Sequence, residues 1–444
     1  MIIIHNISKD NDIPLYIQIY EYFKNAIISG DINVGEKLPA IRKLSTDLGV
    51  STTTIENAYM QLEIEGFISS VARKGLFVEK IETLSSHPHD IEQIEVNETN
   101  YYNMNADKET FDFKLWQKHL TKTINEMQEL LITTPSVNGT KQLRKEIAKY
   151  SRELRGANCH YNQIVIASGT QRLLDMLSVM LRDRVKNFAY ESPGYKKAAN
   201  VFKDAGYNLI KIPLIDSEVD VSSLTNQGVD LLYVSPSHQY PTGTVMPYNN
   251  RINLLKWAKE HSKFIIEDDY NSILRYDVNP ISSLQGLSNN NEVIYFGSFS
   301  SLLLPSIRIS YMILPKDLVE VFENSKHRFT QGVSVLEQLT LASFMNSGSF
   351  DRHLRKLKKI QKKKNELIVS LFEKYSFVDV ISASGGLNIL FKLKDFEEQV
   401  FKNASSEQLR IEKISDGSLL FNYSGIAYED IEHVIKNMLT VEEL

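Results

Sequence analysis

The chain has 444 residues and a formal net charge of −5; 42% of the residues are hydrophobic and 24% are charged. This length exceeds one ordinary hydrophobic core, so two or three globular domains are expected. The apolar start is interrupted at once by His5, Asn6 and Lys9, which excludes a signal peptide or a membrane span there and predicts a cytoplasmic protein without membrane attachment. The single cysteine, Cys159, excludes an internal disulfide and a multi-cysteine metal site, and no metal ion is expected.

Residues 1–80 predict three helices followed by a hairpin. Apolar residues at spacings of three and four predict a first helix that ends at Gly30. Pro39 opens a second helix that Gly49 ends, and Ser51 caps a third. Two short strands, FISSV and GLFVE, follow around a basic turn. Two helices joined by a tight turn and followed by a hairpin are typical of a winged helix-turn-helix, whose second helix enters the major groove of DNA.

Polar residues of this region are candidate DNA contacts. Residues 1–80 contain eight Lys and Arg against ten Asp and Glu. A single copy is therefore expected to bind DNA weakly, and its affinity must depend on where the Lys and Arg side chains lie. Hydroxyl and amide groups at the start of the third helix can contact DNA phosphates or the edges of the DNA bases. Basic side chains in the wing can contact phosphates. A single Arg or Thr on a helix is more often solvated surface than a DNA contact, so the prediction rests on the ordered set. The candidates are Arg42, Ser51, Thr52, Thr53, Asn57, Arg73 and Lys74.

The segments LYIQI, GEKLPAIRKLS, LGVSTTTIENAYMQLEIEGFI and GLFV carry a resemblance to a known family. Over essentially its whole length this region resembles the GntR-type DNA-binding domain, which implies a double-stranded DNA operator as partner. The sequence departs from the family at Thr52, where arginine is usual, and at Ala72-Arg73-Lys74, where a glycine-rich wing is usual. These departures concern the DNA sequence that is read and leave the expected fold unchanged.

A polar segment without sustained periodicity, residues 81–105, predicts a linker. His87 and His89 lie in it without a partner cluster, which favours solvated side chains over metal ligands. The remaining residues, 106–444, are expected to form an effector-binding or dimerisation domain. Its large part would span about 106–330 and its small part about 331–444.

The large part shows strand-helix alternation. From Gly139 on, helical segments alternate with the apolar runs QIVIAS, VKNFAYE, NLIKIPL, DLLYVS, KFIIEDD, VIYFGS and ISYMILP. This pattern predicts an α/β fold with a mostly parallel sheet and helices on both faces. A long helix, FDRHLRKLKKIQKKKNELIVSLFEKY, then begins a small α+β subdomain. Its lysine run favours a solvated helix face over a DNA-binding patch.

The residues just after the strands are the informative ones, because ligands of such sheets bind there. A Ser-Gly-Thr-Gln segment that opens a helix can hold a phosphate, and the carboxylates of the Asp-Asp-Tyr segment are costly unless a cation meets them. In their order these loops resemble the fold-type-I aminotransferase domain of MocR/GabR-type regulators, from about Tyr102 to the C-terminus. The resemblance implies a pyridoxal 5'-phosphate (PLP) pocket, in which Tyr195 stacks on the ring, Asp268 pairs with the ring nitrogen and Tyr270 bonds the ring hydroxyl. The implied pocket consists of Gly169, Thr170, Gln171, Tyr195, Asp268, Tyr270, Ser298, Ser300 and Arg308.

Two positions depart from the pattern of this family. The lysine that bonds the cofactor falls seven residues before Arg308 in the family, which is Ser301 here, and no lysine lies between Lys263 and Lys316. The arginine that binds the substrate carboxylate falls at Leu420. We therefore expect no catalytic residue and no transamination; PLP would bind only noncovalently, or be absent.

Three functions remain open: a DNA-binding transcription regulator, an active aminotransferase with an appended DNA-binding module, and a scaffold whose large domain only dimerises. Ser301 counts against the second. The retained Tyr195, Asp268, Tyr270 and Arg308 favour a pocket for a small-molecule effector over a mere scaffold. The family resemblance also implies a head-to-tail homodimer.

Overall fold

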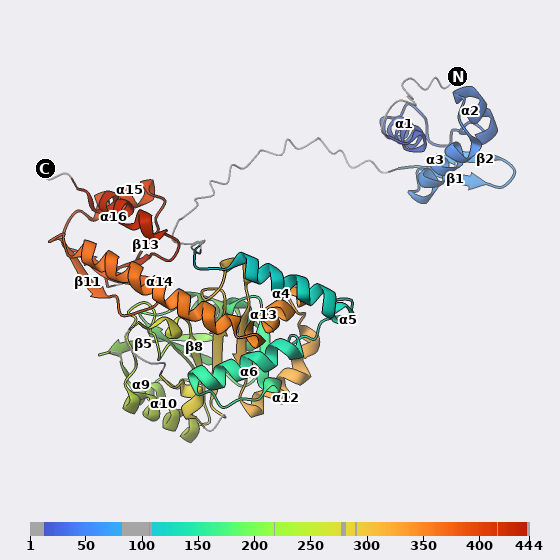
Figure 1. Cartoon of the computed structure of the whole chain (residues 1–444). Helices are drawn as coiled ribbons and strands as arrows, with labels where there is room; N and C mark the ends of the chain where they lie inside the picture. The colour runs from blue at the N-terminus through green and yellow to red at the C-terminus, as the bar shows by residue number, and fades with distance from the viewer. Residues whose placement is uncertain are drawn as a thin grey trace. The chain divides into compact units, whose positions relative to one another are not determined.

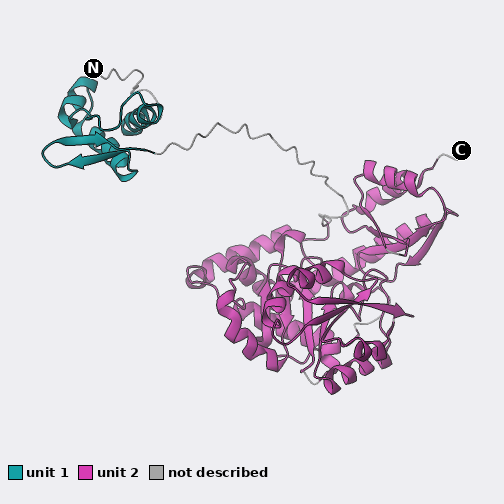
Figure 2. Cartoon of the chain, turned by 180° about the vertical axis from the view of Figure 1, so that it is seen from behind, with its two compact units in different colours: residues 1–97 teal, residues 98–444 magenta. Residues whose placement is uncertain are grey.

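The structure is a computed structural model that describes residues 13–81, 106, 109–216, 218–276, 281–288, 291–414 and 416–441. The chain forms two compact units, residues 1–97 and 98–444 (Figure 2). The predicted linker, residues 81–105, lies outside the described residues apart from Ile81, and so do His87 and His89.

The first unit contains the predicted helices and hairpin (Figure 1). Gly30 and Gly49 end the first two helices in the left-handed conformation, with φ of 82° and 64°, which glycine adopts without steric cost. One apolar cluster joins the three helices and the hairpin; its centre includes Ile19, Phe23 and Leu62. The elements are α1 (Leu15–Ser29), α2 (Ile41–Leu48), α3 (Thr52–Ile64), β1 (Ile68–Val71) and β2 (Gly75–Val78).

The second unit is built on an eight-stranded sheet with the order β3-β10-β9-β8-β7-β4-β5-β6. The seven predicted apolar runs are all strands. The pairs from β9 through β5 are parallel, whereas β10 is antiparallel to both β3 and β9, and the short β6 is antiparallel to β5. The fold is therefore the predicted mostly parallel α/β sheet. Its strands are β3 (Ile164–Ala167), β4 (Asn187–Ser192), β5 (Asn208–Ile215), β6 (Glu218–Val219), β7 (Leu231–Val234), β8 (Phe264–Asp269), β9 (Val293–Ser298) and β10 (Ser310–Ile313).

Helices cover both faces of this sheet, because its central strands are apolar on both sides. One face packs against α7, α8 and α12. The other packs against α6, α13 and the first half of α14, and, near β4 and β5, against α9, α10 and α11. The helices are α4 (Phe113–Glu126), α5 (Gln128–Leu131), α6 (Lys141–Arg155), α7 (Thr170–Met180), α8 (Lys196–Asp204), α9 (Val221–Asn226), α10 (Tyr248–Glu260), α11 (Leu284–Leu287), α12 (Lys316–Ser325), α13 (Val335–Asn346) and α14 (Ser349–Phe372).

The C-terminal part has a sheet and an apolar cluster of its own. The four strands are antiparallel in the order β11-β12-β14-β13, and their cluster begins at Ile368, near the end of α14. Residues Leu341–Leu357 of α13 and α14 pack instead in the core of the large sheet, so α14 belongs to both parts. The elements are β11 (Val378–Ser382), β12 (Asn388–Leu393), α15 (Glu397–Ser406), β13 (Ile411–Lys413), β14 (Leu419–Asn422) and α16 (Ile431–Leu439).

Candidate functional site

The helix α3 has one buried and one exposed face. Its buried residues Ile55, Ala58, Tyr59 and Leu62 join the core, and the Tyr59 hydroxyl donates to the Pro39 carbonyl at 3.1 Å. The candidate DNA contacts Thr52, Thr53 and Asn57 are exposed on the other side. Ser51 is exposed too, but its hydroxyl accepts from the Thr54 backbone N–H at 3.1 Å and so caps the helix.

The basic residues among the candidate DNA contacts are exposed at two places in the first unit. Arg42 lies on α2, and Arg73 and Lys74 lie in the turn between β1 and β2. A fourth base, Lys37, was missed by the sequence reasoning although it lies in the GEKLP segment. It pairs with Phe77 of β2, and a Cβ on Gly75 would come within 2.7 Å of its Cε. The stem of Lys37 therefore packs on the wing, although the residue as a whole is exposed.

In the second unit, the start of α7 and the loop after β9 form a cradle. The guanidinium of Arg308 lies against Gly169, so closely that a Cβ there would come within 2.6 Å of Nη2. Ser298 accepts hydrogen bonds from the Ser310 hydroxyl at 3.0 Å and the Ser300 N–H at 3.3 Å. The Ser300 hydroxyl is buried and has no hydrogen-bond partner among the described residues. Strand β10 holds these parts together, because Ser310 pairs with both Ala167 and Ser298.

Beside this cradle lies a group of aromatic rings around Asp268. The Asp268 carboxylate accepts a hydrogen bond from the Tyr233 hydroxyl, and burial raises its pKa to about 6. The Tyr195 ring is nearly parallel to that of Tyr233, at 6.3 Å between centroids and an angle of 22°. Burial raises the pKa of Tyr195, Asp268 adds to that rise and Arg308 opposes it. The predicted residues Tyr195, Asp268 and Arg308 are thus brought together.

Tyr270 lies in contact with two residues of the SPSHQYPTG loop that sequence reasoning left unassigned. Its ring meets His238 at 5.4 Å and Tyr240 at 5.9 Å between centroids, and Tyr240 in turn meets Tyr195 at 6.2 Å. His238 is buried, and burial lowers its pKa to about 4. A Cβ on Gly386 would come within 2.6 Å of the His238 Nε2. The close fit of His238 could not be foreseen, because Gly386 is distant in the sequence.

Asp269 has a structural partner that the sequence also did not reveal. Arg155, the last residue of α6, donates from Nε to Asp269 at 2.5 Å and from Nη2 to Ser237 at 2.7 Å, and both ends of the ion pair are 2% exposed. Tyr295 also donates to Asp269. The two neighbouring carboxylates therefore differ: Asp269 is paired with a cation, whereas Asp268 faces tyrosines.

The remaining predicted positions lie near these groups or at the junction with the small part. Ser301 is half-buried, directly after Ser300. Gln171 is exposed in the first turn of α7. Leu420 is buried on β14 opposite Leu390. Its neighbours Leu419 and Phe421 join the small core, so Leu420 points to the other face of that sheet.

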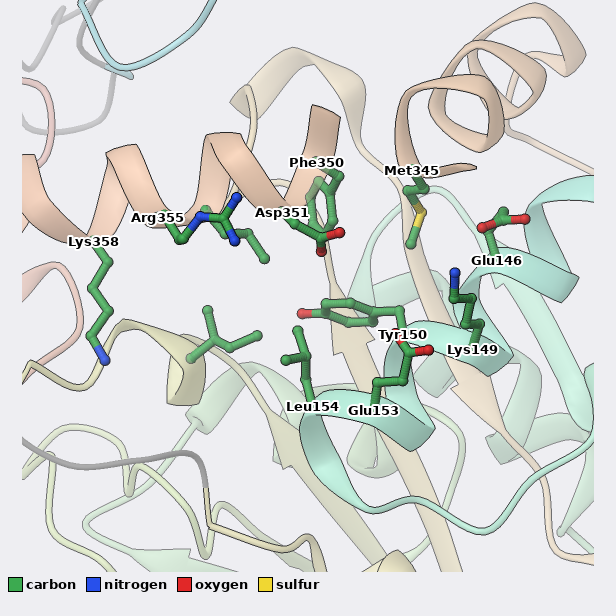
Figure 3. Close-up of a pocket in the computed structure, with 12 residues that line it drawn as sticks. Glu146, Lys149, Tyr150, Glu153, Leu154, Met345, Phe350, Asp351, Arg355 and Lys358 are labelled. Atoms are coloured by element: carbon green, nitrogen blue, oxygen red, sulfur yellow. The ribbon is translucent and has the colours of Figure 1, made fainter. Parts of the chain in front are cut away.

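A pocket of about 390 Å³ lies between α6 and α14, apart from the predicted PLP residues. Figure 3 shows Tyr150 and Phe350 at its centre and charged side chains of both signs around them, including Lys149 and Arg355. A much smaller cavity beyond Tyr150 is lined by Asp269 and Ser298 among others. The cradle at Gly169 and Arg308 is therefore distinct from the pocket between α6 and α14.

The part of the chain that the structure describes has neither a metal-binding cluster nor a membrane-spanning helix. No group of three or more His, Cys, Asp or Glu side chains there could hold a metal ion. None of the described helices combines the length and the apolar character that crossing a membrane requires.

Known proteins are similar to both units of the chain. Residues 15–78 match the model of the family described as bacterial regulatory proteins, gntR family. The chain is 34% identical to the uncharacterized HTH-type transcriptional regulator YdeL of Bacillus subtilis, over 97% of each protein. It is 27% identical to the probable rhizopine catabolism regulatory protein MocR of Rhizobium meliloti, over 90% of this chain and 86% of that protein.

Among solved structures, the kynurenine aminotransferase of Pyrococcus horikoshii is similar in fold. The match has a TM-score of 0.66 and 23% identity, and covers 75% of this chain and 88% of that one. The second unit thus has the aminotransferase type I fold, which is a PLP-binding fold. Together with the gntR-family match and the full-length relatives, this fold shows that the chain belongs to the MocR-type HTH transcriptional regulators, with a GntR-family DNA-binding unit joined to an aminotransferase-like unit.

Proposed function

We propose that this regulator senses a small ligand by binding PLP reversibly in its aminotransferase-like unit, without a covalent bond and without transamination. The observation that carries the proposal is the cradle at the start of α7. There the Arg308 guanidinium packs on Gly169, and the buried Ser300 hydroxyl has no hydrogen-bond partner among the described residues. A buried hydroxyl without a partner costs free energy, and a phosphate oxygen would satisfy it.

The residues around this cradle fit the cofactor. The backbone N–H groups of Thr170 and Gln171, at the positive end of α7, would hold the phosphate together with Arg308, Ser298 and Ser300. The Tyr195 ring would stack on the pyridine ring, Asp268 would pair with the ring nitrogen, and Tyr270 would bond the ring hydroxyl. When bound, the cofactor supplies an aldehyde and an electron-withdrawing ring.

We propose that Ser301 takes the place of the family's lysine and so removes catalysis. A serine hydroxyl neither bonds the cofactor's aldehyde as an amine does nor moves a proton at neutral pH. The sequence has no lysine from 264 to 315. Leu420 would also leave a substrate carboxylate without a charged partner. An active aminotransferase is therefore the less favoured function.

A titration tests reversible binding. Added PLP should change its absorbance spectrum on binding to the protein and return to the free spectrum after dialysis. Arg308→Met should weaken binding by about 1.5–3 kcal/mol, the usual worth of a charge-assisted hydrogen bond. The control Arg184→Met removes an arginine that is exposed at another place in the same unit and should bind as the wild type does. Equal binding by all three proteins would contradict the assignment of Arg308.

For the DNA-binding unit we propose Arg42, Ser51, Thr52, Thr53, Asn57, Arg73 and Lys74 as the contacts to the operator. Their exposure on one end of α3, on α2 and in the wing supports this assignment. Because the hydroxyl of Ser51 caps α3, its contribution to DNA would be secondary.

Arg42→Ala should weaken binding to the operator by about 1–3 kcal/mol if the side chain reads a base. Arg42 is exposed on α2, so the substitution should leave the fold intact. Mobility-shift affinities give the measurement, with the neighbouring exposed Lys43→Ala as the comparison. If Arg42→Ala bound the operator and random DNA with unchanged affinity, Arg42 would not be a DNA contact.

We also propose that the regulator acts as a homodimer, head to tail as the family resemblance implies. Support comes from exposed apolar residues on α4 and just after α5. Ile124 is 42% exposed and Ile132 is 87% exposed. A dimer interface over these side chains would remove their apolar surface from water.

A further inference from the structure

Helix α14 carries an unbroken row of cations on one side. Arg352, Lys356, Lys359 and Lys363 are all exposed and follow each other at spacings of four, three and four, which places them within a narrow stripe of an α-helix. We call them the basic row. With a rise of about 1.5 Å per residue the row is about 17 Å long, and no Asp or Glu occurs in α14 between Arg352 and Lys363.

The cations of this row lack acidic partners among the described residues. Lys359 and Lys363 form no ion pair with any residue that the structure describes. Arg352 donates to the Ser349 hydroxyl at 2.9 Å, and Lys356 donates to the backbone carbonyl of Glu109 at 2.5 Å. Like charges at these spacings destabilise a helix. A helix surface that only needed solvation would gain from interspersed carboxylates, as Lys362 and Glu366 show at 3.7 Å beside the row.

A second set of cations adjoins the first. Lys114, Lys118 and Lys122 are exposed at spacings of four on α4, which packs with α14 against α13 (Figure 1). His119 of α4 lies within 3.5 Å of the Ser349 hydroxyl at the start of α14. Lys122, Lys118 and Arg352 together oppose the protonation of His119 and so lower its pKa, after burial as the larger cause. The two sets therefore adjoin at the start of α14.

The basic surface of α14 and α4 supplies positive charge that the DNA-binding unit lacks. Residues 1–80 contain more acids than bases, and phosphate neutralisation by Lys and Arg supplies most of the sequence-independent affinity for DNA. We propose that the basic row, with the lysines of α4 beside it, binds the phosphate backbone of DNA outside the bases that the winged helix reads. The aminotransferase-like unit thereby adds affinity without adding sequence specificity.

The test uses the full chain and an operator obtained by in vitro selection with it. Binding is measured by fluorescence anisotropy between 50 and 300 mM KCl on two duplexes, one that ends with the operator and one with about 20 base pairs of flanking DNA on each side. The wild type should bind the flanked duplex more tightly and with a steeper salt dependence. Replacing the basic row by Arg352→Gln, Lys356→Gln, Lys359→Gln and Lys363→Gln should remove that difference. The slope of log K against log salt should fall by up to about 3.6 per chain, with at least a tenfold loss at 50 mM KCl.

The matched control has the same change of net charge elsewhere in the unit: Lys256→Gln, Lys259→Gln, Lys316→Gln and Lys402→Gln, all at exposed positions. It should retain the wild-type difference between the duplexes. If the fourfold variant melts early, Lys359→Gln with Lys363→Gln, for which a slope change of up to about 1.8 is expected, replaces it. A basic-row variant with the control's affinity and salt slope on the flanked duplex would overturn the proposal. The proposal would also be overturned if the basic-row variant lost affinity equally on the short duplex and still bound the flanked duplex more tightly than the short one.

Discussion

The wild-type protein is expected to show no transamination with any amino donor and no covalent attachment of PLP, and Ser301→Lys is expected to gain that attachment. Transamination requires one amine that bonds the cofactor, gives way to the substrate and then moves a proton. The Ser301 hydroxyl can do none of these. The substituted lysine would follow Ser300 directly, beside the cradle that Gly169 and Arg308 form.

Borohydride treatment followed by intact-mass measurement gives the readout. The wild type should keep its mass after incubation with PLP, whereas Ser301→Lys should gain one pyridoxyl group, located at residue 301 by peptide mapping. The control Ser306→Lys places a lysine at an exposed position in the same loop and should gain none above background. A specific pyridoxyl group on a native lysine of the wild type would show that another residue has taken the role. Failure of Ser301→Lys to gain one would mean that the pocket no longer fits the cofactor.

The second large effect is on stability. Arg155→Met should lower the free energy of unfolding of the second unit by about 3–5 kcal/mol, because it leaves the buried Asp269 without its cation. The guanidinium also donates to the Ser237 hydroxyl and to the Ile281 carbonyl at 2.5 Å, so the substitution leaves several buried acceptors unsatisfied. Arg155 thereby fixes the end of β8, where Asp268 faces the predicted pocket.

Urea unfolding followed by tryptophan fluorescence measures this loss selectively, since both tryptophans, Trp116 and Trp257, lie in the second unit. The control Lys149→Met changes an exposed residue of the same helix and should shift stability by less than about 0.5 kcal/mol. In the double variant Arg155→Met with Asp269→Asn, the loss should be smaller than in Arg155→Met alone, because the buried charge is gone. A single variant as stable as the control would show that the ion pair contributes nothing.

Local patterns determined much of this fold. The apolar runs from QIVIAS to ISYMILP are all strands, and short apolar runs bounded by turn residues are typical of strands in a sheet that helices cover. Gly30, Gly49 and Ser51 end or begin the helices as expected, since capping depends on a few adjacent residues. The motifs between the strands also sufficed to identify the family.

Other features depend on residues far apart in the chain, and only the tertiary structure decided them. The sequence of a strand does not indicate which strands it pairs with. The segment ISYMILP therefore did not predict that β10 lies between β3 and β9 and runs antiparallel to both. Arg155 reads as an ordinary base at the end of a helix until the fold brings Asp269, 114 positions away, to it. The basic row reads as a solvated helix face until its exposure, its lack of acidic partners among the described residues and its place beside the lysines of α4 are known. The sequence by itself thus determined the elements and the family, because these rest on local periodicity and motifs. The tertiary structure decided the long-range partners, because burial and electrostatics act through space.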